Sequence, residues 1–248
     1  MITSDEGSVT NSTSVDCVHI QNSTITGDVT NTASGVLNQP ANAGLAVDQN
    51  STVTGNVQND GQISGAEGIR VSASTIDGLI ENNNSIAGDI YGIRLVNGAL
   101  AGGLTNSGTV AGATYGMVLE SGAVFSGDIV NSGTFQGGGS GIALIDSTMS
   151  GRIINSGDVI GTTAISIVLV NTNVSGGISN EASGQIIGDE QGLYVSGAAG
   201  SPLTITNGGL IRGTSAVGIY LLDADLGGGI ANEASGQIIG GQYGISAG

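Results

Sequence analysis

The sequence predicts an all-β fold, a right-handed single-stranded parallel β-helix, and two observations carry that prediction. A pattern of Gly, an apolar residue, any residue and an apolar residue recurs every 23 to 28 residues along most of the chain. Glycine, at 46 of the 248 residues, interrupts every window that could form a helix. Each glycine inside a helix costs about 1 kcal/mol. A regular repeat that cannot be helical is typical of a β-solenoid.

The recurring pattern marks the first strand of each repeat, with Ala164 standing where the other repeats have Gly. Because alternate residues of a strand face opposite sides, the second and fourth residues of the pattern are expected in the core and the third outside. The pattern starts at Gly44, Gly68, Gly92, Gly116, Gly141, Ala164, Gly192, Gly218 and Gly244. The expected core column is Ile69, Ile93, Met117, Ile142, Ile165, Leu193 and Ile219.

Two further short strands follow in each repeat, expected for example at Ala99–Asn106 and Thr109–Gly112. Glycine at the breaks supplies turn conformations that other residues resist. Three short strands and three turns in about 24 residues describe one coil of a parallel solenoid. We expect about nine such coils in a single domain over residues 1–248. Residues 1–43 should form less regular coils, and residues 44–248 regular repeats with an open C-terminal end.

An Asn ends the second strand of every coil. A row of this kind could bind a ligand. However, an Asn at a corner can also accept turn N–H groups and bond the equivalent amide of the next coil. We interpret the row as structural on that mechanism. Its members are Asn31, Asn59, Asn82 or Asn83, Asn106, Asn131, Asn155, Asn180, Asn207 and Asn232.

Composition excludes several classes of partner. Four Lys and Arg residues stand against 20 Asp and Glu, a formal net charge of −16, so a nucleic-acid backbone would be repelled. The single Cys17 cannot form an intramolecular disulfide, and the single His19 completes no Cys/His cluster. We therefore expect no metal site and no small-molecule cofactor. The sequence also contains no apolar run long enough for a transmembrane helix.

The third residue of the first-strand pattern forms a column that is expected to face solvent. Four of its members, Arg70, Arg94, Tyr194 and Tyr220, are the candidate binding residues, since Tyr combines an apolar ring with a hydroxyl and Arg presents a fork of donors. The alternative is that they are ordinary solvated residues. The full column is Ala46, Arg70, Arg94, Val118, Ala143, Ser166, Tyr194, Tyr220 and Ser246.

Carboxylates show no catalytic pattern in the sequence. A polysaccharide-processing β-helix enzyme needs carboxylates gathered on one face. Asp128 and Arg152 occupy equivalent places in consecutive coils and are expected to form a cross-coil ion pair. The other acidic residues are expected to be scattered over turns and faces, and the chain is predicted not to be an enzyme. They are Glu67, Asp89, Glu120, Asp146, Asp189, Glu190 and Asp223.

The repeats, the run TNSGTVAGATYGMVLESGAVFSGDIVNSGTFQGG in particular, resemble the passenger domains of bacterial autotransporters and filamentous-haemagglutinin-like adhesins. The resemblance covers nearly the whole chain. It implies a secreted or cell-surface scaffold, displayed at the outer membrane only through a segment that this sequence lacks. It also implies adhesion to a glycan or to a host or neighbouring cell surface, or end-to-end self-association. Two alternatives remain: a polysaccharide-processing or tailspike-like depolymerase, and a filament or surface-layer subunit.

Overall fold

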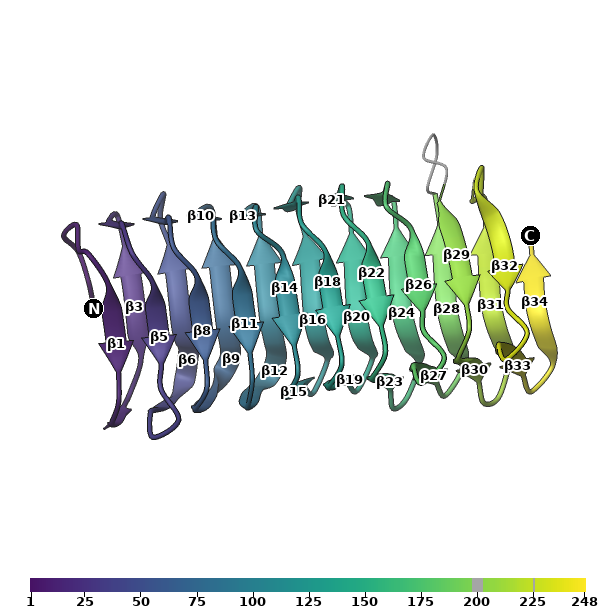
Figure 1. The fold of residues 1–248 in the computed structure, drawn as a ribbon, viewed down its shortest axis with the longest axis horizontal. Helices are drawn as coiled ribbons and strands as arrows, with labels where there is room; N and C mark the ends of the chain where they lie inside the picture. Colours follow the sequence, from purple (N-terminus) through teal and green to yellow (C-terminus); the bar gives the residue numbers. More distant parts are fainter. Residues whose placement is uncertain (198–202, 225) are drawn as a thin grey trace.

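The chain forms one β-solenoid of about nine turns, with roughly 25 residues per turn. The computed structural model describes residues 1–197, 203–224 and 226–248. The strands stack side by side along a rod whose two termini lie at opposite ends (Figure 1). These residues are all-β, with parallel pairing from coil to coil, so the predicted fold class is confirmed. None of the described residues forms a helix of the length and hydropathy required to cross a membrane.

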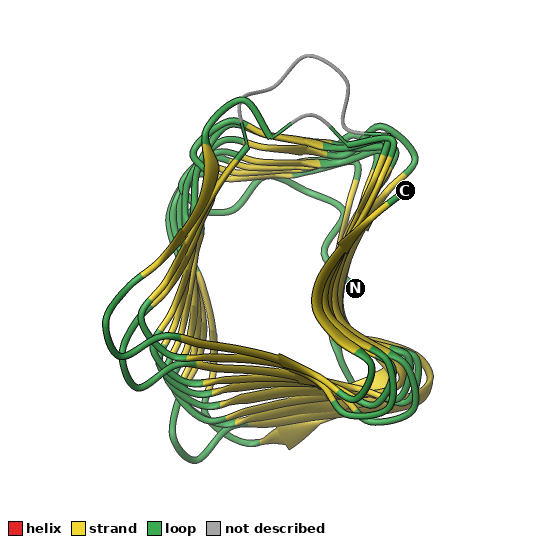
Figure 2. Ribbon diagram, turned by 90° about the vertical axis from the view of Figure 1, so that its right-hand side faces the viewer, coloured by secondary structure: helices red, strands yellow, loops and turns green. Residues whose placement is uncertain are grey.

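The described strands form three parallel sheets, which wrap around a common interior (Figure 2). We call them the long sheet, the short sheet and the Asn sheet. The short sheet consists of β4 (Thr24–Ile25), β7 (Thr52–Val53), β10 (Thr75–Ile76), β13 (Ala99–Leu100), β17 (Val124–Phe125), β21 (Thr148–Met149) and β25 (Asn173–Val174). The Asn sheet consists of β1 (Val9–Asn11), β5 (Val29–Asn31), β8 (Val57–Asn59), β11 (Ile80–Asn82), β14 (Leu104–Asn106), β18 (Ile129–Asn131), β22 (Ile153–Asn155), β26 (Ile178–Asn180), β29 (Thr204–Asn207) and β32 (Gly229–Asn232).

The long sheet holds the first strand of each coil and also the last strand of the preceding coil. These two strands are continuous in three successive coils of the N-terminal half and separate in the other coils. The sheet consists of β2 (Ser14–Val15), β3 (Val18–Gln21), β6 (Val36–Asp48), β9 (Gln62–Ser72), β12 (Ser85–Val96), β15 (Thr109–Gly112), β16 (Tyr115–Glu120), β19 (Thr134–Gly137), β20 (Ser140–Ile145), β23 (Asp158–Gly161), β24 (Ile165–Val170), β27 (Gln185–Gly188), β28 (Gln191–Ser196), β30 (Leu210–Gly213), β31 (Val217–Leu222), β33 (Gln237–Gly240) and β34 (Tyr243–Ala247).

The segment expected as one strand over Ala99–Asn106 is interrupted, and its two halves belong to different sheets. β13 ends at Leu100 in the short sheet, and β14 begins at Leu104 in the Asn sheet. Gly103, between them, has a φ of +103°, a conformation that glycine adopts without steric cost. The chain therefore turns a corner here, where strand periodicity alone predicted continuity.

The register of β24 differs from the sequence prediction. Ile142 pairs with Ile167, which in turn pairs with Leu193, so Ile167 and not Ile165 belongs to the core column. Val168 faces outward, and Ser166 is buried with its hydroxyl donating to the carbonyl oxygen of Val159. The expectation of Ile165 inside and Ser166 outside was therefore wrong.

The glycine of the first-strand pattern explains how this shift occurs. A Cβ added to Gly92 would lie 2.4 Å from the carbonyl oxygen of Gly116, because the backbones of adjacent coils approach closely at this corner. Ser166 occupies the equivalent place in its coil. Its side chain is small, and its hydroxyl donates a hydrogen bond to the carbonyl oxygen of Val159. The repeat therefore requires a small residue at this place. Most coils have Gly there, and this coil has Ser.

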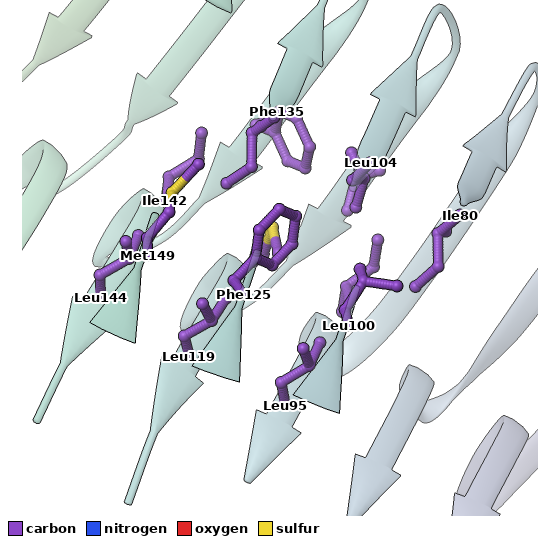
Figure 3. Close-up of a cluster of buried hydrophobic side chains, with 14 of the residues drawn as sticks. Ile80, Leu95, Leu100, Leu104, Leu119, Phe125, Phe135, Ile142, Leu144 and Met149 are labelled. Carbon is purple, nitrogen blue, oxygen red and sulfur yellow. The ribbon is translucent and has the colours of Figure 1, made fainter. Parts of the chain in front are cut away.

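The interior is filled by columns of aliphatic side chains, with two aromatic rings in the middle of the rod. Phe125 and Phe135 are fully buried and lie among Leu104, Leu119 and Met149 (Figure 3). Burial of each such side chain stabilises the fold by about 1.5–3 kcal/mol. Apart from Ile165, the predicted core column is confirmed, since its members are buried in one continuous cluster.

A ladder of buried Asn side chains runs the length of the Asn sheet. In every step the Nδ2 of one Asn donates to the Oδ1 of the Asn in the next coil, over 2.7–2.9 Å. The predicted amide-to-amide bonding is confirmed, with Asn82 as the member from its coil and Asn11 as a further member. The side chains mainly donate to turn carbonyls, as Asn131 does to Gly133, whereas the sequence suggested acceptance of turn N–H groups.

The corner after the first strand is a second repeated feature, and it uses few glycines. Non-glycine residues with φ between +46° and +60° occupy it in eight coils, where the sequence suggested glycine. Asn and Asp tolerate this left-handed conformation best among non-glycine residues. The described corner residues with positive φ are Asn22, Gln49, Asn50, Ala73, Asn97, Ser121, Gly122, Asp146, Asn171, Gly197 and Asp223.

We predict that Asn131→Ala lowers the free energy of unfolding by about 2–4 kcal/mol, because Asn106 and Asn155 would lose their buried partners. Urea unfolding followed by circular dichroism measures the change. Asn83→Ala is the matched control, since Asn83 is exposed and lies one residue beyond the ladder. Equal effects of the two substitutions would contradict a structural role for the ladder.

We predict that Ala73→Gly raises the free energy of unfolding by up to about 1 kcal/mol, because Ala73 has a φ of +47°. Thermal melting measures the effect. Ala101→Gly, at an exposed position without positive φ, should lower the melting temperature instead. A fall in both variants would refute the strain argument.

Candidate functional site

The outer surface of the first strands is the candidate site. The wall that ends at the C-terminus bends toward the interior, so its outer surface is concave (Figure 2). We call this surface the concave face. Each coil contributes three outward residues to it, from β3, β6, β9, β12, β16, β20, β24, β28, β31 and β34. The resulting columns run along the rod, one of them through Arg70, Arg94, Val118, Ala143, Val168, Tyr194 and Tyr220.

Curvature buries several side chains that point outward. Val118 and Ala143 are inaccessible to solvent although they belong to the column that was expected to be exposed, and Ala46 is only 2% exposed. For these three residues the expected exposure was wrong. The flanking columns close over the middle column at the bottom of the bend. A charged side chain in this column is therefore partly removed from water and needs a partner.

The N-terminal half of the concave face holds a chain of alternating charges. Arg70 donates two hydrogen bonds to the carboxylate of Asp48, from Nη2 to Oδ2 at 2.6 Å and from Nε to Oδ1 at 3.1 Å. Its Nη1 lies 3.3 Å from Oε2 of Glu67. Arg94 links the other oxygen of Glu67, at 2.9 Å, to Glu120, at 2.6 Å. A depression of about 340 Å³ lies over Asp48, Arg70 and Arg94. We call Asp48, Glu67, Arg70, Arg94 and Glu120 the ion network.

Both guanidinium groups are held by these carboxylates. The hydrogen bond that Arg70 donates to Asp48 raises the pKa of Arg70. Burial by itself lowers the pKa of Arg94, but the hydrogen bonds that Arg94 donates to Glu67 and Glu120 outweigh it, so the pKa is raised. Glu67 lies between the two arginines with its side chain 9% exposed. Both Arg side chains are therefore already engaged in ion pairs within the wall.

An imidazole and two aromatic rings extend the ion network. His19 Nε2 lies 3.0 Å from Asp48 Oδ2. Tyr91 and Tyr115 stack with ring centroids 5.9 Å apart, and the guanidinium of Arg94 lies 5.1 Å from the centre of Tyr91. Burial raises the pKa of the Tyr115 phenol. Hydrogen bonds and ion pairs thus connect the charged half from β6 to β16.

The C-terminal half of the concave face carries no charged residue among its described positions. Tyr194 and Tyr220 are half-buried, and their ring centroids lie 5.7 Å apart. We call this surface the uncharged half. Its residues are Ser140, Ala143, Ile145, Ile165, Val168, Val170, Gln191, Tyr194, Ser196, Val217, Tyr220, Leu222, Tyr243, Ser246 and Gly248.

The four candidate binding residues form two groups. Arg70 and Arg94 are adjacent in the ion network, and Tyr194 and Tyr220 are adjacent in the uncharged half. Arg94 and Tyr194 are four coils apart, about 19 Å at the usual spacing of paired strands. The structure therefore places them on one face but in two different environments.

Two expectations about acidic residues need correction. Glu67 and Glu120 were expected to be scattered, yet both belong to the ion network together with Asp48. The signal was present in the sequence, since Glu67 lies three residues before Arg70, and Glu120 is in the column of Asp48. Asp128 is next to Arg152 as expected, but its carboxylate accepts the backbone N–H of Arg152 at 2.7 Å, and among the described residues it forms no ion pair with the guanidinium.

Within the described parts of the chain, no group of three or more His, Cys, Asp and Glu side chains is placed to hold a metal ion. Comparison with known proteins gives no match to a family model, to a curated protein or to a solved structure. The function of the chain is therefore inferred from the geometry of the charged and the uncharged half.

We predict that Glu67→Gln lowers the free energy of unfolding by about 1–3 kcal/mol, because one neutral amide cannot replace a carboxylate shared by two half-buried arginines. Urea unfolding measures it. Glu233→Gln, at an exposed position, is the control and should change stability by less than about 0.5 kcal/mol. A similar small change in both variants would show that the ion network contributes little.

Proposed function

We propose that this chain is a non-enzymatic, secreted or cell-surface β-solenoid scaffold of the autotransporter-passenger kind, which mediates adhesion or self-association. The observation that carries the proposal is the contrast between the inside and the outside of the coils. Inward positions repeat the same aliphatic residues and the same Asn from coil to coil, whereas outward columns change from charged to uncharged along the rod. A constant frame that displays a variable surface suits a scaffold for contact with other surfaces.

The state of the carboxylates supports a role other than catalysis. General acid or base chemistry requires a carboxylate that can reach a substrate proton. Asp48, Glu67 and Glu120 each accept a charge-assisted hydrogen bond from an arginine, and Glu67 is shared between two. Bonds of this kind are about twice as strong as neutral ones. We therefore assign the cluster to the stability of the wall and do not propose a depolymerase.

Self-association belongs to the same proposal. In the coil that contains β32, β33 and β34, the inward residues Ile230 and Ile238 are only partly buried, and Ile245 is 47% exposed. Asn232 donates to the carbonyl oxygen of Gly236, and its amide has no further Asn above it in the described coils. A further coil stacked here would extend both the apolar core and the ladder. End-to-end contact between copies is one way to supply it.

The test is to immobilise the purified chain on glycan and extracellular-matrix arrays, and to follow its sedimentation over a range of concentrations. Binding to a surface component, or association that increases with concentration, is the expected outcome. Absence of both would refute adhesion and self-association together. Release of shorter sugars from a bound polysaccharide would refute the non-enzymatic assignment.

A further inference from the structure

We propose that the uncharged half of the concave face, centred on Tyr194 and Tyr220, binds a neutral glycan chain lying along the rod. This inference rests on the proposed adhesive function and names the site and the ligand class. It differs from the sequence expectation, which grouped these tyrosines with Arg70 and Arg94. The two arginines belong to the ion network and are left out of the site.

Charge is the first argument for a neutral ligand. The chain has a formal net charge of −16, which repels polyanions at a distance. The side chains of the uncharged half include no carboxylate, and the adjoining Asp146, Glu190 and Asp223 lie in the bends at its borders. An uncharged surface on a strongly acidic protein is therefore complementary to an uncharged partner.

The mixture of polar and apolar side chains is the second argument. β24 presents Ile165, Val168 and Val170, and β31 presents Tyr220 and Leu222, with Val217 buried beside them. Between them β28 presents Gln191, Tyr194 and Ser196. Aliphatic side chains thus alternate with tyrosines and smaller polar groups over successive coils, about 4.8 Å apart. A sugar chain has the same mixed character, with C–H faces and hydroxyl edges.

Available hydrogen-bonding groups are the third argument. The Oε1 of Gln191 accepts no hydrogen bond from the described residues, but it is buried, so the accessible groups are the phenol hydroxyls. The hydroxyls of Tyr194 and Tyr220 extend from aromatic bodies that can pack against the apolar face of a sugar ring. Hydroxyl groups of a glycan both donate and accept, so they can bond with both phenols.

The same features disfavour a polypeptide ligand. Addition of a strand requires an open edge, whereas β24, β28 and β31 are paired on both sides. A helix that placed its apolar stripe on the face would cover Gln191 and Ser196 with apolar groups, and burial of polar groups without partners costs about 1–3 kcal/mol each. A glycan meets neither obstacle.

The experiment measures binding of dextran, mannan, galactan and cellohexaose to the purified chain by calorimetry, at low and at high salt. Heparin and alginate serve as acidic probes, and an amphipathic helical peptide serves as the polypeptide probe. We expect at least one neutral glycan to bind with an affinity that salt leaves nearly unchanged. Binding of only the acidic probes or only the peptide, or of none of these probes, would overturn the inference.

Variants locate the site. Tyr194→Ala combined with Tyr220→Ala should weaken glycan binding on the order of tenfold or more. Val168→Glu, beside Tyr194 in the same column, should do the same by adding a charge to the face. Tyr91→Ala with Tyr115→Ala is the matched control, because it removes the other stacked pair, in the charged half, and should leave glycan binding unchanged.

Circular dichroism spectra and melting curves show whether each variant is folded, and Tyr194→Phe with Tyr220→Phe retains the rings if the alanine variant does not fold. The phenylalanine variant should bind less tightly than the native chain, since it lacks both hydroxyls. Equal loss of binding in the matched control would overturn the assignment of the site. If matrix components bind the native chain and the Tyr194/Tyr220 variant equally, adhesion is retained and the glycan site is refuted.

Discussion

The structure depends on stacking of the coils in register. A single coil has short strands that cannot bury their apolar faces or satisfy their own N–H and C=O groups, so each coil requires its neighbours. The Asn ladder specifies the register, because a slip of one residue would turn the Asn side chains outward and place their neighbours in the core. Buried amides bonded over 2.7–2.9 Å in one direction along the rod therefore link nine successive steps of the stack.

Because the interior supplies the stability, the outer columns are free to differ. The column of Arg70 and Arg94 continues through Val118 and Ala143 to Tyr194 with no change in backbone pairing. The bend of the wall then determines which of these side chains meet. In the charged half the bend brings carboxylates against guanidinium groups, and in the uncharged half it leaves tyrosines and aliphatic residues half-exposed on one surface. One wall thus provides a stabilising network and a candidate binding surface.

The accuracy of sequence reasoning differed between features, for physical reasons. The Asn row could be predicted because a polar side chain repeated between aliphatic positions needs a buried partner, and the next coil supplies one. The position of Ser166 could not, because Ala164-Ile165-Ser166-Ile167 and Ser166-Ile167-Val168-Leu169 both fit a small residue followed by alternating apolar positions. Only the pairing of Ile167 with Ile142 and Leu193 distinguishes them.

The sequence by itself determined the repeat length, the acidic character and, except in the coil of Ile165 and Ser166, which residues of the first strands face inward and outward. These properties follow from periodicity and composition, which depend on neighbours along the chain. Only the tertiary structure decided that Glu67 lies between Arg70 and Arg94, that Val118 is buried, and that Tyr194 and Tyr220 are separated from the arginines. Periodicity tells which side of a wall a residue faces but not how the wall curves. In this wall a Cβ on Gly92 or Gly116 would clash with the backbone of the next coil, and the small Ser166 takes the equivalent place in its own coil.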